Sequence, residues 1–94
     1  MMRIAWSETA IANLIEIRQF IEQDKPEAAR LLAGRILRCV ERLAKYPHLG
    51  RSGREPEIRE LIIAGTPYIV CYRVERSRLA ILAVLHASQR APEE

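Results

Sequence analysis

The sequence has 94 residues, a length that suits one domain with a single hydrophobic core and leaves no room for a second. Hydrophobic residues make up 49% of the chain and charged residues 29%, and no apolar run approaches the roughly 20 residues of a membrane-spanning helix, which argues against a protein anchored by such helices. This length predicts one domain, residues 1–94. The opening MMRIAWSET lacks the apolar region of a signal peptide, so we expect the protein in the cytoplasm.

The net charge of +3 is concentrated in one segment of the chain. Residues 35–59 contain seven basic and three acidic side chains, whereas residues 1–34 contain four basic and five acidic ones, and residues 60–94 contain four of each. Two explanations fit this distribution: a solvated helix face, or a surface that meets nucleic acid or an acidic protein.

The cysteines and histidines show no metal-binding pattern. Cys39 and Cys71 are far apart and belong to no CxxC pair, and His48 and His86 add no ligand spacing to them. We therefore expect buried, reduced thiols, and we predict no metal and no cofactor.

The first half of the chain reads as one strand and two helices. Met2–Trp6 is a strand candidate, and Ser7 is a good N-cap for a helix that extends to Asp24. Its apolar stripe comprises Ala10, Leu14, Ile17 and Ile21, widened by Ile11 and Ile15.

A second helix starts at Pro26, since proline suits the first turn of a helix and cannot continue the preceding one. It should end near Tyr46, because Pro47 disfavours helical geometry in the residue before it. Its stripe comprises Ala29, Leu32, Ile36, Val40 and Leu43, with Cys39 packing beside it. The short joint makes the two helices an antiparallel hairpin.

The second half predicts a loop, Pro47–Glu57, followed by three strands. The strand candidates are Ile58–Ile63, Tyr68–Glu75 and Leu79–Ala87. Short joints imply antiparallel neighbours. The predicted fold class is α+β, in the order β-α-α-β-β-β, with an antiparallel sheet packed on the two-helix hairpin.

The last two strands are apolar on both faces. Strict alternation places Ile81, Ala83 and Leu85 on one face of the last strand, and Leu82, Val84 and His86 on the other. Because only two helices are available as cover, we predict that another chain completes part of the second face or a sheet edge. The alternative is the residual apolar surface that is normal in a small domain.

The order of these elements, together with DKPEAA, YPHLGR, IREL, PYIVCYRV and ILAVLHASQR, resembles the RelE/ParE superfamily over nearly the whole chain. Its members are toxins of type II toxin–antitoxin systems, often described as plasmid stabilisation proteins. The resemblance implies a toxin neutralised by a cognate antitoxin that wraps its sheet and the groove beside its helices. Without the antitoxin, the uncovered surface would allow a homodimer.

The resemblance leaves two activities open. RelE-like members cleave mRNA in the ribosome without a metal, and ParE-like members inhibit DNA gyrase. Arg59 matches the arginine that opens the first sheet strand in the superfamily, but the RelE-like basic position at the end of that strand falls on the apolar Ile63 and Ala64. Ile69 stands where RelE-like enzymes often carry arginine, and no tyrosine follows His86.

These departures favour the ParE-like branch and a protein that acts by binding. If the chain is a ribonuclease instead, its catalytic candidates are Arg59, His86 and Arg90. A third reading is a degenerate toxin that still binds its antitoxin. The predicted target- or antitoxin-binding residues are Arg51, Arg54, Arg59, Tyr68, Tyr72, Arg73, His86 and Arg90, although Tyr68 and Tyr72 also suit the core and Arg73 and Arg90 suit surface ion pairs.

Overall fold

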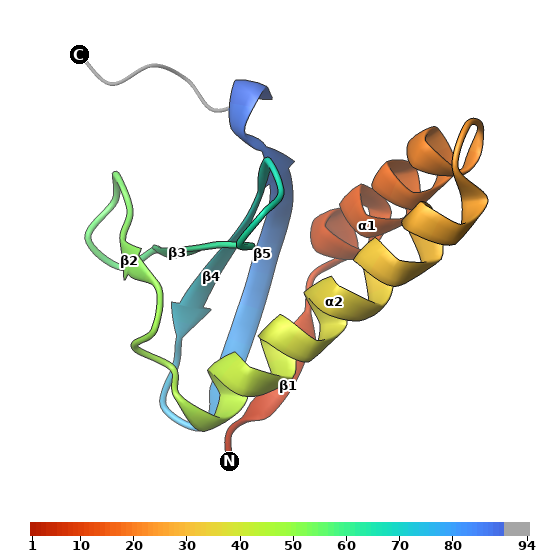
Figure 1. Cartoon of the computed structure of the whole chain (residues 1–94). Coiled ribbons are helices and arrows are strands. Elements are labelled where there is room, and N and C mark those ends of the chain that lie inside the picture. The colour runs from red at the N-terminus through yellow and green to blue at the C-terminus, as the bar shows by residue number, and fades with distance from the viewer. Residues whose placement is uncertain (90–94) are drawn as a thin grey trace.

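The two helices form a hairpin that lies on one face of a five-stranded sheet (Figure 1). This computed structural model describes residues 1–89. The elements are β1 (Arg3–Trp6), α1 (Glu8–Glu22), α2 (Pro26–Lys45), β2 (Arg51–Ser52), β3 (Arg59–Ile62), β4 (Tyr68–Val74), β5 (Arg78–His86) and a 3₁₀ turn, η1 (Ala87–Gln89). Within the described range, neither helix is both long and apolar enough to cross a membrane.

The strand order in the sheet is β1-β5-β4-β3-β2. Neighbours from β2 to β5 are antiparallel, as the short joints predict, but β1 pairs with β5 in parallel. The α+β class is therefore confirmed, and the predicted strands and helices occur in the predicted order. β2 is an additional short strand within the segment predicted as a loop, and the sheet is mixed rather than wholly antiparallel. No short joint links β1 to β5, because nearly the whole chain separates them, so these two strands are free to pair in parallel.

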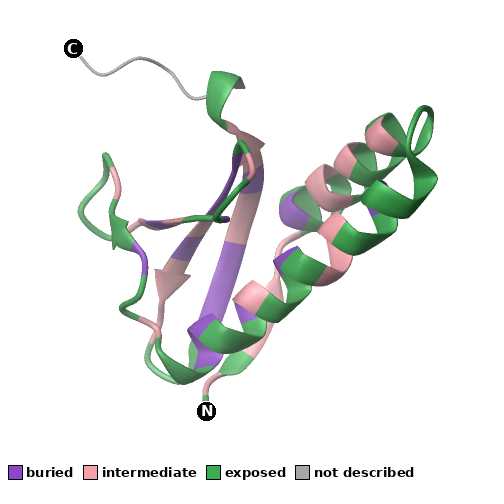
Figure 2. Ribbon diagram, in the orientation of Figure 1, coloured by how far each residue is buried: buried purple, intermediate pink, exposed green. Residues whose placement is uncertain are grey.

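The core fills the space between the helices and the sheet. Residues on the predicted helix stripes pack there against Tyr72 and Val70 of β4 and Ile81 of β5. Figure 2 shows this distribution, with the buried positions on the central strands and on the sheet-facing sides of both helices. Ile11 and Ile15 are exposed, so the prediction that they widen the stripe of α1 was wrong. They lie too far round the helix to reach the sheet.

An irregularity in β5 changes which side chains face the helices. Cys71 pairs with Ala83 and Tyr72 pairs with Ile81, so Leu82 has no opposite residue on β4. A bulge of this kind shifts the alternation of side chains by one position. Ile81 therefore joins Val84 in the core, and the strict alternation that placed it with Ala83 and Leu85 was wrong.

The face of the sheet opposite the helices is largely apolar, and neither of the two described helices covers it. The register places Ile69, Ala83 and Leu85 there together, and Ile62 on the adjacent strand is 50% exposed. Glu60 lies on the same face and is itself buried. Completion of this face by another chain remains a prediction.

Ser7 links the start of α1 to β5. Its side-chain oxygen accepts a hydrogen bond from the Ala10 N–H (3.0 Å) and donates one to the Leu82 carbonyl (3.0 Å), while the Ser7 N–H donates to the Ile81 carbonyl (3.0 Å). The predicted N-cap is confirmed, and it also secures the bulge of β5.

We expect Ser7→Ala to lower the free energy of unfolding by about 1–2 kcal/mol, because it leaves the N–H of the buried Ala10 without its cap. Urea titration followed by circular dichroism measures this change. Thr9→Ala removes an exposed hydroxyl two residues away and is the matched control. Equal stability of the two variants would contradict the capping role.

Candidate functional site

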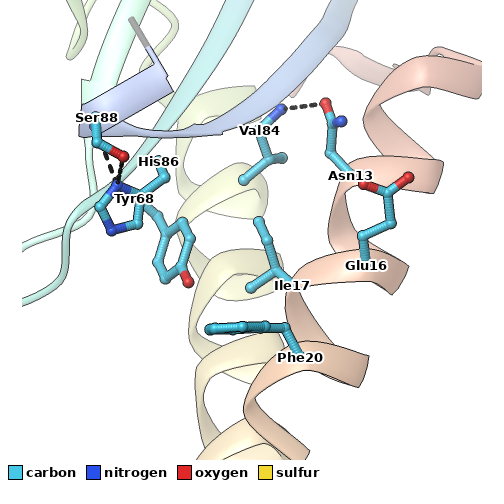
Figure 3. A pocket seen from close by; sticks show the side chains of 8 residues that line it. All are labelled: Asn13, Glu16, Ile17, Phe20, Tyr68, Val84, His86 and Ser88. Carbon is cyan, nitrogen blue, oxygen red and sulfur yellow. Dashed lines mark hydrogen bonds between the residues drawn. The ribbon is translucent and has the colours of Figure 1, made fainter.

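An open groove of about 470 Å³ lies between α1 and the end of β5. α1 contributes Asn13, Glu16, Ile17 and Phe20 to its lining, and the sheet and η1 contribute Tyr68, Val84, His86 and Ser88. Figure 3 shows the aromatic ring of Phe20 and that of Tyr68 directed into the same space. With its side chain 72% exposed, Phe20 is the largest apolar surface at this groove. Phe20 lies outside the core stripe of α1. A large aromatic residue at such a position is the sequence signal that could have identified it as a candidate site residue.

The groove exists because β1 is shorter than β5. The parallel pairing ends at Trp6 and Ile81, five residues before the end of β5. Beyond that point Asn13 replaces the missing strand, since its side-chain oxygen accepts a hydrogen bond from the Val84 N–H (3.0 Å; Figure 3). The sheet edge is thus bonded to a helix side chain, and the space between the two elements stays open.

His86 lies at the end of the groove, within a small set of fixed contacts. Its ring packs edge-on against Tyr68, with the ring centroids 5.4 Å apart. The Ser88 N–H donates to His86 Nδ1 (3.0 Å), and the Ser88 hydroxyl oxygen lies 2.7 Å from the same nitrogen. Because a backbone N–H can only donate, Nδ1 is an acceptor here, and the neutral ring carries its proton on Nε2.

Arg59 and Tyr72 belong to a different part of the structure, where they hold the loop after α2. The Tyr72 hydroxyl accepts a hydrogen bond from the Gly50 N–H (2.8 Å) and donates one to the Pro47 carbonyl (2.8 Å). Arg59 Nη1 donates to the Gly50 carbonyl (2.7 Å). Tyr72 is fully buried, so of its two predicted roles the structure supports the core position.

Gly50 is required by this arrangement. A Cβ at this position would lie 2.4 Å from the Tyr72 hydroxyl oxygen and 2.9 Å from the Glu60 carbonyl oxygen, closer than atoms can approach.

Burial raises the pKa of Tyr72 above its usual value near 10, and the Gly50 N–H and the Arg59 charge offset only part of this effect.

The structure does not bring the two described catalytic candidates, Arg59 and His86, together. Arg59 is opposite Tyr72 on β4, whereas His86 is opposite Tyr68. Four residues of strand separate these positions, about 13 Å at about 3.3 Å per residue. No arginine or lysine is among the described residues that line the groove beside His86. Arg90, the third candidate, lies outside the described residues.

The other predicted arginines among the described residues lie on the sheet or in the loop between β2 and β3. Arg51 faces Glu60 across the β2–β3 pair at 3.6 Å, and Arg54 is exposed in the following loop. Arg73 pairs with Glu75 at 3.1 Å, as the ion-pair reading predicts. Hydrogen bonds from Arg78 and Arg73 hold the pKa of Glu75 below its usual range. The structure places none of these arginines in the groove.

Comparison with solved structures identifies the class of protein. The chain superposes on a chain of a chromosomal ParDE toxin–antitoxin system from P. aeruginosa with a TM-score of 0.83 and 26% identity, over 92% of this chain and 96% of the other. A conserved hypothetical protein from Helicobacter pylori, HP0894, shares the fold at a TM-score of 0.59 and 14% identity, over 94% and 97% of the two chains.

Sequence comparison supports the same class. The chain is 45% identical over 91 residues to the putative toxin Y4kP of Sinorhizobium fredii, covering 97% of this chain and 94% of the relative. It is 34% identical over 89 residues to the toxin RelE2 of Caulobacter vibrioides, covering 95% and 99%. The fold and these relatives define a toxin of a type II toxin–antitoxin system.

The family follows from a match over residues 4–91 to the ParE toxin of the type II system parDE. This chain belongs to the ParE toxin family, within the RelE/ParE superfamily. The family assignment implies an antitoxin as partner.

Tyr72→Phe should lower the free energy of unfolding by about 1–3 kcal/mol at neutral pH, because it leaves the Gly50 N–H and the Pro47 carbonyl without their partner. The raised pKa means that Tyr72 keeps its proton in the folded state after the unfolded chain has lost it. Its stabilising contribution is therefore complete below about pH 10 and decreases above that pH, so the difference between the two proteins should shrink there.

Urea titrations from pH 7 to pH 11 measure this difference directly. Tyr46→Phe is the matched control, because Tyr46 is exposed and should show neither effect. A pH-independent difference between Tyr72→Phe and the unmodified chain would contradict the role assigned to the hydroxyl.

Proposed function

We propose that this protein is a ParE-like toxin that acts in the cytoplasm, inhibits DNA gyrase by binding the gyrase–DNA complex, and is held inactive by its antitoxin. The observation that carries the proposal is the separation of Arg59 from His86 by about 13 Å along β4. This separation argues against joint action on one phosphate by the two candidates that lie within the described residues.

RNA cleavage without a metal makes a specific demand on a site. A general base must take the proton of the 2′-hydroxyl, and cations must lie close by to stabilise the charge that develops on the phosphorus. The groove beside His86 offers instead the carboxylate of Glu16 and the apolar side chains of Phe20 and Ile17. This lining suits a protein segment better than a polyanion.

The comparisons support both branches to different degrees. The match to the ParE family and the structural match to a ParDE system favour the gyrase reading. The relative named RelE2 keeps the ribonuclease reading as the second candidate, with ribosome-bound mRNA as substrate. A degenerate toxin without activity is the third, and growth after induction distinguishes it, since such a chain would not arrest cells.

The groove is also our candidate for the antitoxin site. Ile17, Phe20 and Tyr68 offer apolar surface beside the edge of β5, at the point where β1 no longer covers it. An antitoxin segment seated there would bury the exposed ring of Phe20 and the adjacent strand edge.

With purified gyrase and plasmid DNA, an excess of this protein should inhibit supercoiling and increase cleaved DNA, and addition of the antitoxin should restore activity. Supercoiling and cleavage assays on agarose gels measure both effects. Unchanged gyrase activity at toxin excess would refute the gyrase part of the proposal.

An experiment in cells distinguishes the gyrase proposal from the ribonuclease alternative. If the protein inhibits gyrase, mapping of mRNA ends after toxin induction should show no new codon-positioned cuts, and His86→Ala should retain growth arrest. Cuts that disappear in His86→Ala would establish the ribonuclease and overturn the gyrase proposal.

Phe20→Ala should weaken antitoxin binding by about 10-fold or more, because truncation of an aromatic anchor in an interface typically costs at least about 1.4 kcal/mol. Isothermal titration calorimetry measures the change. Ile15→Ala is the matched control, since Ile15 is an exposed apolar residue of α1 outside the groove lining. Equal losses in the two variants would exclude the groove as the antitoxin site.

A further inference from the structure

Four basic side chains form a stripe along the second half of α2. Arg35, Arg38, Arg42 and Lys45 follow one another at intervals of three, four and three residues, which places them on one side of the helix. All four are exposed, and no carboxylate described in the structure lies within ion-pairing distance of any of them. This basic stripe is the centre of the positively charged segment found in the sequence.

Helix electrostatics explains only half of the stripe. Arg42 and Lys45 lie in the last turn of α2, where positive charge is favoured by the helix dipole. Arg35 and Arg38 lie further back, and their mutual proximity raises the electrostatic cost of the arrangement. Arg35 extends towards the β3–β4 turn, where both of its terminal nitrogens lie 3.6 Å from the position of a Cβ on Gly65. An anionic ligand would offset that cost.

The stripe leads into a second pocket, of about 480 Å³, at the end of α2. Arg42, Lys45 and His48 contribute cationic or titratable groups to its lining, and Tyr46 and Leu49 contribute apolar surface. Tyr46 is 52% exposed, with Lys45 Nζ 5.6 Å from the centroid of its ring. The hydrogen bonds of Tyr72 to Pro47 and Gly50 hold the adjoining loop in place, so the pocket is preformed.

We propose that the basic stripe and the Tyr46 pocket form a DNA-contacting surface, in which the stripe binds consecutive phosphates of one strand and the pocket takes an unpaired base against Tyr46. The stripe spans about 15 Å at about 1.5 Å per residue and carries four cations, so it can neutralise up to about four phosphates of one strand. An aromatic ring beside cations is the arrangement that binds single-stranded DNA. The setting, a gyrase complex with opened DNA, rests on the proposed function; the DNA contact itself does not.

The test is fluorescence anisotropy with a labelled 20-nucleotide single strand and the matching duplex, without gyrase, between 50 and 200 mM salt. Four phosphate contacts predict a slope of about −3 in log affinity against log salt for the single strand, a loss of roughly 50-fold over this range. The double variant Arg38→Gln/Arg42→Gln should reduce the size of the slope by about 1.4. The double variant Arg18→Gln/Arg30→Gln removes the same charge from exposed, ion-paired helix positions and should bind like the unmodified chain.

Tyr46 tests the pocket separately from the stripe. Tyr46→Ala should weaken single-strand binding by at least about five-fold, whereas Tyr46→Phe, which keeps the ring, should bind normally. Duplex binding should be weaker than single-strand binding in the unmodified chain and should change little in either variant.

Three results would overturn the inference: equal DNA binding by the two double variants, no dependence on salt, or binding of a polyglutamate peptide in place of DNA. Gyrase assays on the same proteins separate this inference from the proposed function. Stripe-dependent DNA binding without any effect on gyrase would leave the inference standing and refute the proposed function. Gyrase inhibition by a chain whose DNA binding does not depend on the stripe would refute the inference and leave the proposed function standing.

Discussion

The length difference between β1 and β5 is the constraint on which the rest of the structure depends. β5 has nine residues and β1 only four, so the parallel pair stops at Ile81 and the remaining strand needs other hydrogen-bond partners. Ser7, the N-cap of α1, and Asn13 within the helix provide them, and this fixes the helix beside the strand without covering it. The bulge at Leu82, the position of Ile81 in the core and the groove are all consistent with this arrangement.

A second fixed point lies at the other end of the helix layer, where Tyr72 binds both Pro47 and Gly50. The loop after α2 therefore leaves the helix in one direction, and the pocket containing Tyr46 lies beside it. The two candidate surfaces come from different elements: the groove from α1 and the end of β5, and the stripe from α2. Occupation of one therefore does not by itself cover the other.

Local sequence signals predicted the elements well, because Ser7, Pro26 and Pro47 mark helix boundaries by backbone chemistry alone. They did not predict the parallel pairing of β1 with β5. These strands lie at opposite ends of the chain, and no local sequence signal sets the direction in which they pair. The bulge at Leu82 was also beyond them, because it lies where the strand is bonded to Ser7, 75 residues away in the sequence. The candidate site was found only in part for the same reason: His86 and Tyr68 were identified as strand residues, but Phe20 and Asn13 join them only in the folded chain.

The two surfaces differ in chemistry, so their affinities for a partner should depend differently on salt concentration. The groove is lined mainly by apolar and aromatic side chains with one carboxylate, so its affinity for a partner comes chiefly from burial, which salt affects little or strengthens. The stripe carries cations without carboxylate partners among the described residues, so its affinity for a polyanion comes from counterion release and falls steeply with salt. A toxin with both surfaces would hold its antitoxin over a wide range of ionic strength, whereas its affinity for a nucleic-acid target would fall as the ionic strength rises.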